Sequence, residues 1–217
     1  PPADVLAYFG RSLATRGFWE NAGASAWRVL SAMSLAWLVA FPLGLILGHV
    51  RSVDNTLSPM VFLTYPLPKI VLLPLFLTLF GLGDLPRVLL IALTTGYQIL
   101  VVTRASAQGL DKKYLDSFRS LGGTPLQMLR HVLIPAAMTA LKVASGTAVA
   151  VLFMAESFAT RRGLGFLIMD AWGRGDQLEM FTGILAMSLL GVALYELCNV
   201  LETRSCRWRN FHMAGKR

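Results

Sequence analysis

The sequence predicts an all-α, polytopic membrane protein. Hydrophobic residues make up 55% of the 217 residues and charged residues only 15%, against about 25% charged residues in a typical soluble domain. The chain also contains five apolar stretches long enough to cross a bilayer. This composition excludes soluble globular, disordered and collagen-like proteins. Cys198 and Cys206 are too few for a secreted disulfide framework.

The first 24 residues are predicted to form an external amphipathic segment. Residues 3–22 alternate short apolar groups with Arg11, Arg16 and Glu20, which is typical of a helix lying in the membrane interface. No signal-peptide pattern is visible there.

The membrane helices follow in order. About 20 apolar residues are needed to cross the hydrocarbon core, and residues 29–48 supply such a stretch without a charge. The second stretch, 56–83, contains Pro66, Pro68 and Pro74. Each proline removes a helix donor, so this stretch is predicted to be broken or kinked. The remaining stretches are residues 87–104, 136–158 and 179–201.

The orientation follows from the preference of Lys and Arg for cytoplasmic loops. With five crossings, one side holds 11 of the 20 basic residues, against 7 on the other. This places the N-terminus outside, a loop at 108–135 in the cytoplasm, and a basic cytoplasmic tail at 204–217, with the membrane domain covering 25–203. The net charge of +8 fits a surface facing anionic membrane lipid better than nucleic acid, for which no motif is present.

The loop at 108–135 is the most informative segment. Tyr114, Leu115, Phe118 and Leu121 follow helical spacing and predict a short helix with one apolar face. A helix with an exposed aromatic residue at the cytoplasmic surface is suited to bind a soluble partner protein and to be displaced by its movement.

A second short helix is predicted to follow. Gly122 and Gly123 end the first helix, because glycine accepts left-handed backbone angles. Thr124 is a good N-cap, and Gln127 completes a capping box. Pro135 marks the start of the fourth membrane helix.

This segment resembles the EAA loop of ABC importer permeases, whose pattern is E-A-A, three residues, Gly, nine residues, I-x-L-P. Asp116-Ser117-Phe118 stands at the E-A-A position, Gly122 follows after three residues, and Val132-Leu133-Ile134-Pro135 stands at the I-x-L-P position. Asp keeps the charge of Glu and Ser keeps the small size of Ala, whereas Phe118 is bulkier than the usual Ala.

The resemblance runs from about Pro2 to Arg207 and is strongest to the permeases of the nitrate, sulfonate, taurine and bicarbonate group. Residues 28–48, 80–93 and 155–165 are similar to segments of that group. Its members usually carry one further helix before the segment that matches Pro1, so the resemblance implies a trimmed or incomplete N-terminus.

The resemblance implies a type I ABC importer transmembrane domain in the bacterial inner membrane, with about five core helices per subunit. The partners it implies are a second copy of the permease, two cytoplasmic ABC ATPase subunits, and a periplasmic or lipid-anchored binding protein. The chain itself would be a non-catalytic transport subunit without a cofactor, because ATP and Mg²⁺ would be bound by the ATPase. The solute would be small and anionic.

The motifs in the chain agree with this division of labour. The sequence has no G-x-x-x-x-G-K-[ST] phosphate loop and no H-E-x-x-H motif. His49, His131 and His212 lack metal-ligand spacing. The energy of ATP hydrolysis would therefore come from a partner subunit, and the loop would be the contact that transmits it.

The predicted site has two parts. The ATPase contact and its support comprise Leu115, Asp116, Ser117, Phe118, Leu121, Gly122, Gly123, Val132, Ile134 and Pro135. A candidate outer gate or pathway comprises Glu156, Arg161 and Arg162.

Ionisable residues inside membrane segments are candidates for function. Glu156 either borders the outer gate or pairs with Arg161 or Arg162. Lys69 and Lys142 are explained by snorkelling to the interface. Gly163-Leu164-Gly165 is predicted to make a tight turn before a short re-entrant or interfacial helix.

Other functions stay open from the sequence. A secondary transporter or channel is one alternative, a membrane-embedded enzyme is another, and an ABC permease of another substrate branch is the third. The chain shows no internal repeat and no clustered nucleophile or acid–base pair, which disfavours the first two.

Overall fold

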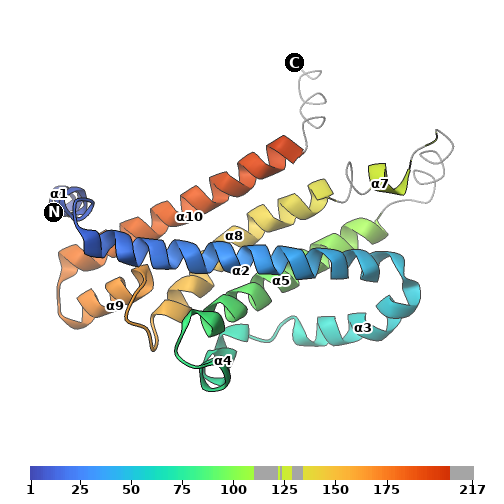
Figure 1. The fold of residues 1–217 in the computed structure, drawn as a ribbon, viewed down its shortest axis with the longest axis horizontal. Helices are drawn as coiled ribbons and strands as arrows, with labels where there is room; N and C mark the ends of the chain where they lie inside the picture. Colours follow the sequence, from blue (N-terminus) through green and yellow to red (C-terminus); the bar gives the residue numbers. More distant parts are fainter. Residues whose placement is uncertain (110–121, 123, 129–133, 206–217) are drawn as a thin grey trace, which may run out of the picture. The chain divides into compact units, whose positions relative to one another are not determined.

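The structure is a computed structural model of residues 1–217, and it describes residues 1–109, 122, 124–128 and 134–205. The described residues form helices and connecting turns, with no strand among them (Figure 1). The helices are α1 (Pro2–Ser12), α2 (Arg16–His49), α3 (Arg51–Thr64), η1 (Lys69–Leu72), α4 (Leu73–Phe80), α5 (Asp84–Gln108), α7 (Pro125–Met128), α8 (Ile134–Glu156), α9 (Leu164–Gly173) and α10 (Gln177–Ser205). The predicted all-α class is confirmed.

Four of the described helices are long and apolar enough to cross a membrane, namely α2, α5, α8 and α10. The helix α3 and the segment Lys69–Phe80 are bent by 89° relative to each other. Together they form a fifth crossing if they count as one broken span. The break lies at Pro66 and Pro68, which cannot donate helix hydrogen bonds. The predicted break in the second span is confirmed.

The N-terminal segment differs from its prediction. Residues 3–22 were expected to form one interfacial helix, but α1 ends at Ser12 and α2 starts at Arg16. At the junction the hydroxyl of Ser12 donates to the carbonyl of Tyr8, and that of Thr15 donates to the carbonyl of Ser12. Such side-chain bonds compete with the helical backbone pattern and favour a turn.

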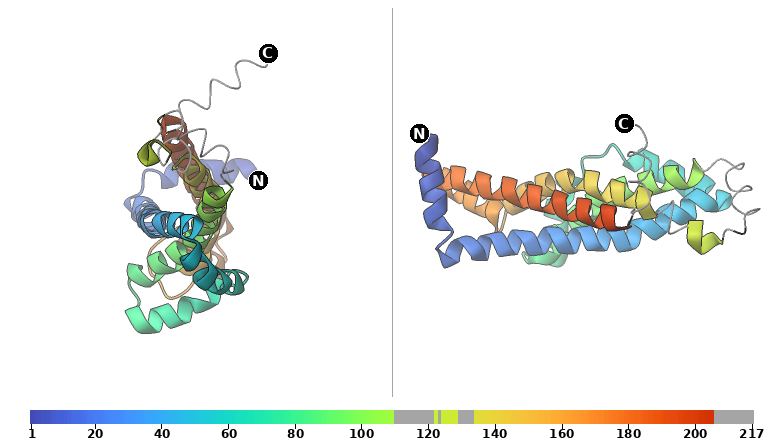
Figure 2. Two further views of the ribbon diagram at one scale, coloured as in Figure 1. Left: turned by 90° about the vertical axis from the view of Figure 1, so that its right-hand side faces the viewer. Right: turned by 90° about the horizontal axis from the view of Figure 1, so that it is seen from above.

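The two helices that meet at this turn pack through aromatic rings. Phe9 of α1 and Phe18 of α2 make an edge-on contact with ring centroids 5.8 Å apart. As a result α1 runs across the start of α2 and not along it (Figure 2).

The chain divides into two compact units. Unit 1 comprises residues 1–35, 68–95 and 145–194, and unit 2 comprises residues 36–67, 96–144 and 195–217. Each of α2, α5, α8 and α10 contributes one part to each unit. The helix ends that the predicted topology assigns to the outside belong to unit 1, and those assigned to the cytoplasm belong to unit 2.

Each unit has its own packing. In unit 1, Leu73, Leu90 and Ala155 form a buried apolar cluster. In unit 2, α2 and α5 meet through small residues: a Cβ added to Gly44 would lie 2.8 Å from the Cβ of Thr103. Small residues at four-residue spacing let two membrane helices approach closely.

Candidate functional site

Much of the predicted ATPase contact lies outside the described residues. This holds for Leu115, Asp116, Ser117, Phe118, Leu121, Gly123 and Val132. Gly122 is described and has a φ of +79°, the left-handed conformation that glycine adopts at a helix end. Ile134 is the first residue of α8 and Pro135 the second, so the fourth membrane helix begins where it was predicted to begin.

The predicted capping box is present before α7. The backbone N–H of Thr124 donates to Gln127 Oε1 at 2.8 Å, and the backbone N–H of Gln127 donates to Thr124 Oγ1 at 3.3 Å. These reciprocal bonds satisfy two donors that a helix start otherwise leaves free. The loop therefore holds a helix start at Thr124–Gln127 that its own side chains stabilise.

An ion pair joins α5, the helix that leads into this loop, to α3. The guanidinium of Arg104 in α5 binds both carboxylate oxygens of Asp54 in α3, with its Nε at 2.6 Å and its Nη2 at 2.8 Å. Gln108 Nε2 donates to the same carboxylate at 2.8 Å, and the hydroxyl of Ser58 donates to it as well. We call this group the Asp54 cluster.

A second ion pair joins α8, the helix that follows the loop, to α10. Lys142 Nζ in α8 lies 2.6 Å from Glu202 Oε2 in α10, and the hydroxyl of Thr139 donates to Glu202 Oε1 at 2.7 Å. Lys142 also donates to Asn199 Oδ1 at 3.3 Å. We call this group the Glu202 cluster. Lys142 is thus held by a carboxylate within the fold, and the snorkelling explanation is wrong for it.

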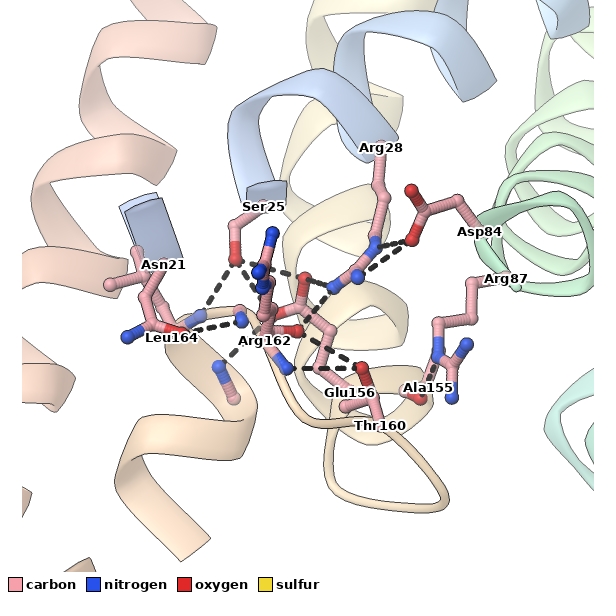
Figure 3. Close-up of polar contacts among 12 residues, drawn as sticks. Asn21, Ser25, Arg28, Asp84, Arg87, Ala155, Glu156, Thr160, Arg162 and Leu164 are labelled. Carbon is pink, nitrogen blue, oxygen red and sulfur yellow. Dashed lines mark hydrogen bonds and ion pairs between the residues drawn. The ribbon is translucent and has the colours of Figure 1, made fainter. Parts of the chain in front are cut away.

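The candidate outer gate is built around a buried carboxylate (Figure 3). Glu156, the last residue of α8, has its side chain fully buried. Arg28 Nη1 of α2 lies 2.6 Å from Glu156 Oε1, and the backbone N–H of Gly165 donates to Glu156 Oε2 at 2.9 Å. The hydroxyl of Ser25 lies 2.7 and 2.9 Å from the two carboxylate oxygens. The charge of Glu156 is therefore paired and hydrogen-bonded, as burial requires.

Arg28 joins this carboxylate to two further segments. Its side chain is only 4% exposed, and its Nε donates to Asp84 Oδ1 at the start of α5 at 2.7 Å. Its Nη1 also donates to the carbonyl of Arg162 at 2.7 Å. Of the two alternatives for Glu156, the pairing with Arg161 or Arg162 is wrong. Arg28 takes that place and leaves both arginines exposed.

Positions 163 and 165 require glycine because the side chain of Glu156 fills the space that a Cβ would occupy. A Cβ added to Gly163 would lie 2.5 Å from Glu156 Cδ, and one added to Gly165 would lie 2.7 Å from Glu156 Cβ. Gly163 also has a φ of +129°, which side chains rarely tolerate. The predicted tight turn before a short helix, α9, is confirmed.

Arg87 of α5 holds the loop that follows α8. Its side chain is fully buried and donates to the carbonyls of Ala155 at 3.2 Å and Phe158 at 3.1 Å. It also donates to the carbonyls of Ala159, Leu82 and Gly83. The last carbonyls of a helix lack partners within the helix, so a buried guanidinium at this position stabilises the end of α8.

A cavity of about 770 Å³ opens beside this group in unit 1. It is lined by Glu20, Ala24, Trp27, Arg28, Leu82, Asp84, Ala159, Thr160, Arg161 and Arg162. Because Arg28 is already paired with Glu156 and Asp84, Arg161 and Arg162 are the lining cations that this cavity offers to a ligand. Of the three predicted gate residues, Arg161 and Arg162 therefore line the cavity, whereas Glu156 lies buried beneath Arg28, which lines it.

Sequence reasoning missed Ser25, Arg28, Asp54, Arg87 and Glu202. Each is a polar or charged residue in or beside an apolar stretch, and this is the signal that marks functional or structural polar sites in membrane proteins. The signal does not name the partner, because each partner lies far away in the sequence.

The chain is similar to known proteins over most of its length. Residues 40–205 match the family described as Binding-protein-dependent transport system inner membrane component. The taurine transport system permease protein TauC of Escherichia coli (strain K12) is 28% identical over 220 residues, covering 96% of this chain and 79% of TauC. The riboflavin transport system permease protein RibX of Chloroflexus aurantiacus is 30% identical over 211 residues, covering 95% and 79%.

The fold is also similar to a solved structure. The MetNI methionine ABC transporter in inward-facing conformations superposes with a TM-score of 0.67, covering 88% of this chain and 94% of that chain at 18% sequence identity. The shared arrangement of helices agrees with the sequence-based assignment of the fold as a type I importer transmembrane domain.

Proposed function

This chain belongs to the family of binding-protein-dependent transport system inner membrane components, and from this premise we propose how it works as the multi-pass permease subunit of an ABC importer. Two copies form the translocation pathway for a small anionic solute. A periplasmic or lipid-anchored binding protein delivers the solute, and two cytoplasmic ATPase subunits bind ATP and Mg²⁺ and supply the energy.

The observation that carries this proposal is the match of residues 40–205 to the family together with helices that cross the membrane up to five times. A loop bearing the EAA spacing stands between α5 and α8. Its second half starts with the Thr124–Gln127 capping box, which supports a stiff element at this position. We assign this loop, residues 108–135, to the contact with the ATPase.

The preference for an anion rests on the cavity in unit 1. Arg161 and Arg162 line it and make no ion pair among the described side chains. Clefts with unpaired cations concentrate anionic solutes. TauC is named for taurine transport and RibX for riboflavin transport, so the names of these relatives point to different solutes. We therefore propose the charge of the solute and not its identity.

Transport measurements test the function. The chain is purified with its ATPase partner and reconstituted into liposomes. These liposomes should take up solute when ATP and the binding protein are present. Uptake that depends on an ion gradient and does not require ATP would instead indicate a secondary transporter.

Substitution in the loop tests the coupling assignment. Phe118→Asp should abolish uptake while the subunit still inserts and ATP is still hydrolysed, because a charge would replace the apolar anchor. Phe118→Leu is the matched control and should retain uptake. Normal uptake by Phe118→Asp would contradict the assigned contact.

A further inference from the structure

The coupling loop joins two helices, and each of them is fastened to a neighbour close to the loop. Arg104 lies in the last turns of α5, before the loop, and Lys142 lies in the third turn of α8, after it. Arg104 is bound to α3 through Asp54, and Lys142 is bound to α10 through Glu202. All four residues belong to unit 2.

The Asp54 cluster is built for a fixed geometry. A guanidinium that binds both oxygens of one carboxylate is oriented as well as attracted. Gln108, Ser58 and Arg104 all donate to the same carboxylate. The Arg104 guanidinium carbon also lies 5.1 Å from the ring centroid of Phe62, a cation–π contact on the same helix α3. These contacts fix the end of α5 against α3.

The Glu202 cluster repeats the arrangement on the other side of the loop. Both oxygens of Glu202 accept bonds from α8, one from Thr139 and one from Lys142. Lys142 also lies 5.6 Å from the ring centroid of Tyr195. The start of α8 is therefore held to α10 at several points.

The partial burial of these ion pairs makes them harder to separate than fully exposed pairs. The side chains of Arg104 and Asp54 are 17% and 13% exposed, and those of Lys142 and Glu202 are 19% and 4% exposed. Removing one partner leaves the other charge partly buried and uncompensated, which is costly, whereas the pair itself adds little to stability compared with apolar packing. Such pairs therefore fix the positions of helices more than they raise stability.

The attachment continues from α5 to α2. A Cβ added to Gly48 would lie 2.3 Å from the Cβ of Ala107, and Gly44 meets Thr103 in the same way. Ala36, Ala40, Gly44 and Gly48 recur every four residues along α2, and Gly96 faces the first two of them from α5. The C-terminal parts of α2 and α5 therefore form one close-packed pair.

From these contacts we infer that Asp54–Arg104 and Lys142–Glu202 are positioning residues for energy coupling, which transmit the displacement of the loop to α3 and α10. This inference rests on the proposed function of the loop. The loop connects covalently only to α5 and α8. The two clusters extend its connection to α3 and α10, and the α2–α5 contact extends it to α2.

The test measures coupling in the complete importer. Permease, ATPase and binding protein are reconstituted in liposomes, and the ATP hydrolysed per solute imported is determined for Asp54→Asn, Glu202→Gln and Lys142→Met. Substitutions along a coupling path change coupling by about 2- to 30-fold. We expect the ratio of ATP hydrolysed to solute imported to rise by this factor, with ATP hydrolysis retained.

Two controls separate coupling from folding. Glu179→Gln removes a carboxylate that pairs with Arg174 in unit 1, away from the loop, and should leave the ratio unchanged. The exchange Lys142→Glu with Glu202→Lys restores opposite charges at the same positions and should bring the ratio back toward the wild-type value. If a neutral variant does not assemble, the exchange pair still provides the comparison.

The outcomes are distinct. Wild-type ratios in all three neutral variants, alongside ATP-driven uptake by the wild-type importer, would overturn this inference and leave the proposed function standing. Equal losses of uptake and hydrolysis that the charge exchange does not repair would also overturn it, because they indicate a structural role only. A wild-type complex without ATP-driven uptake would overturn both.

Discussion

The ion pair between Arg28 and Glu156 yields a quantitative prediction for stability. In the variant Arg28→Met, the fully buried Glu156 keeps only the Ser25 hydroxyl and the Gly165 N–H as donors and loses its cation. Leaving one partner of a buried pair uncompensated costs about 3–5 kcal/mol. The second partner of Arg28, Asp84, has a side chain that is 52% exposed, so water replaces that interaction and Glu156 dominates the cost.

This cost corresponds to a large shift in thermal unfolding. For a chain of this length, 1 kcal/mol shifts the midpoint by about 2–4 °C, so we expect Arg28→Met to unfold about 6–20 °C below the wild type. The measurement is the thermal midpoint of the purified permease in detergent at a fixed heating rate. Adding Glu156→Gln should recover most of the loss, because the uncompensated charge is then absent.

The matched control is Arg174→Met. Arg174 also bridges two carboxylates, those of Asp170 and Glu179, but its side chain is 53% exposed. Exposed ion pairs contribute little, so this variant should unfold close to the wild-type temperature. The reasoning is refuted if Arg28→Met shifts the midpoint no more than Arg174→Met, or if the loss in the Arg28→Met, Glu156→Gln double variant equals the sum of the two single losses.

Three further predictions follow from local geometry. Gly165→Ala should lower the free energy of unfolding by about 1–3 kcal/mol through overpacking, and with it the thermal midpoint. Gly146→Ala, with no atom within 4 Å of the added carbon, should leave the midpoint unchanged, and equal effects would contradict the close-fit explanation. Thr124→Ala should weaken the helix start by about 1 kcal/mol and reduce ATP-driven uptake, while Thr124→Ser should retain it. Gly48→Leu should separate α2 from α5 and lower the yield of folded permease on size-exclusion chromatography, and a normal yield would contradict the close contact with Ala107.

The sequence predicted the features that depend on neighbouring residues. The membrane helices are long apolar stretches, and the break in the second one follows from Pro66 and Pro68. The two residues of the capping box, Thr124 and Gln127, are only three positions apart. These features are local because helix formation and termination are decided by residues within a few turns.

The pairing of buried charges was beyond the sequence because it depends on how distant helices meet. Glu156 and Arg28 are 128 positions apart, and Lys142 and Glu202 are 60 positions apart. Arg161 and Arg162 were the obvious partners for Glu156 by sequence distance. The short turn at Gly163 instead directs the backbone N–H of Gly165 at the carboxylate.

The two units use charged side chains in different ways, and this difference bears on which elements stay together in the proposed importer. In unit 1, Arg28 and Arg87 bind backbone carbonyls of the loop after α8 as well as side chains. A loop held through its own backbone keeps its shape when neighbouring helices shift. In unit 2, the Asp54 and Glu202 clusters join helix to helix through side chains alone. Each carboxylate accepts bonds from several donors, so the joined helices are held in orientation as well as attracted. The chain thus combines a shape-retaining loop beside the candidate gate with helices that stay fastened to each other beside the loop assigned to the ATPase.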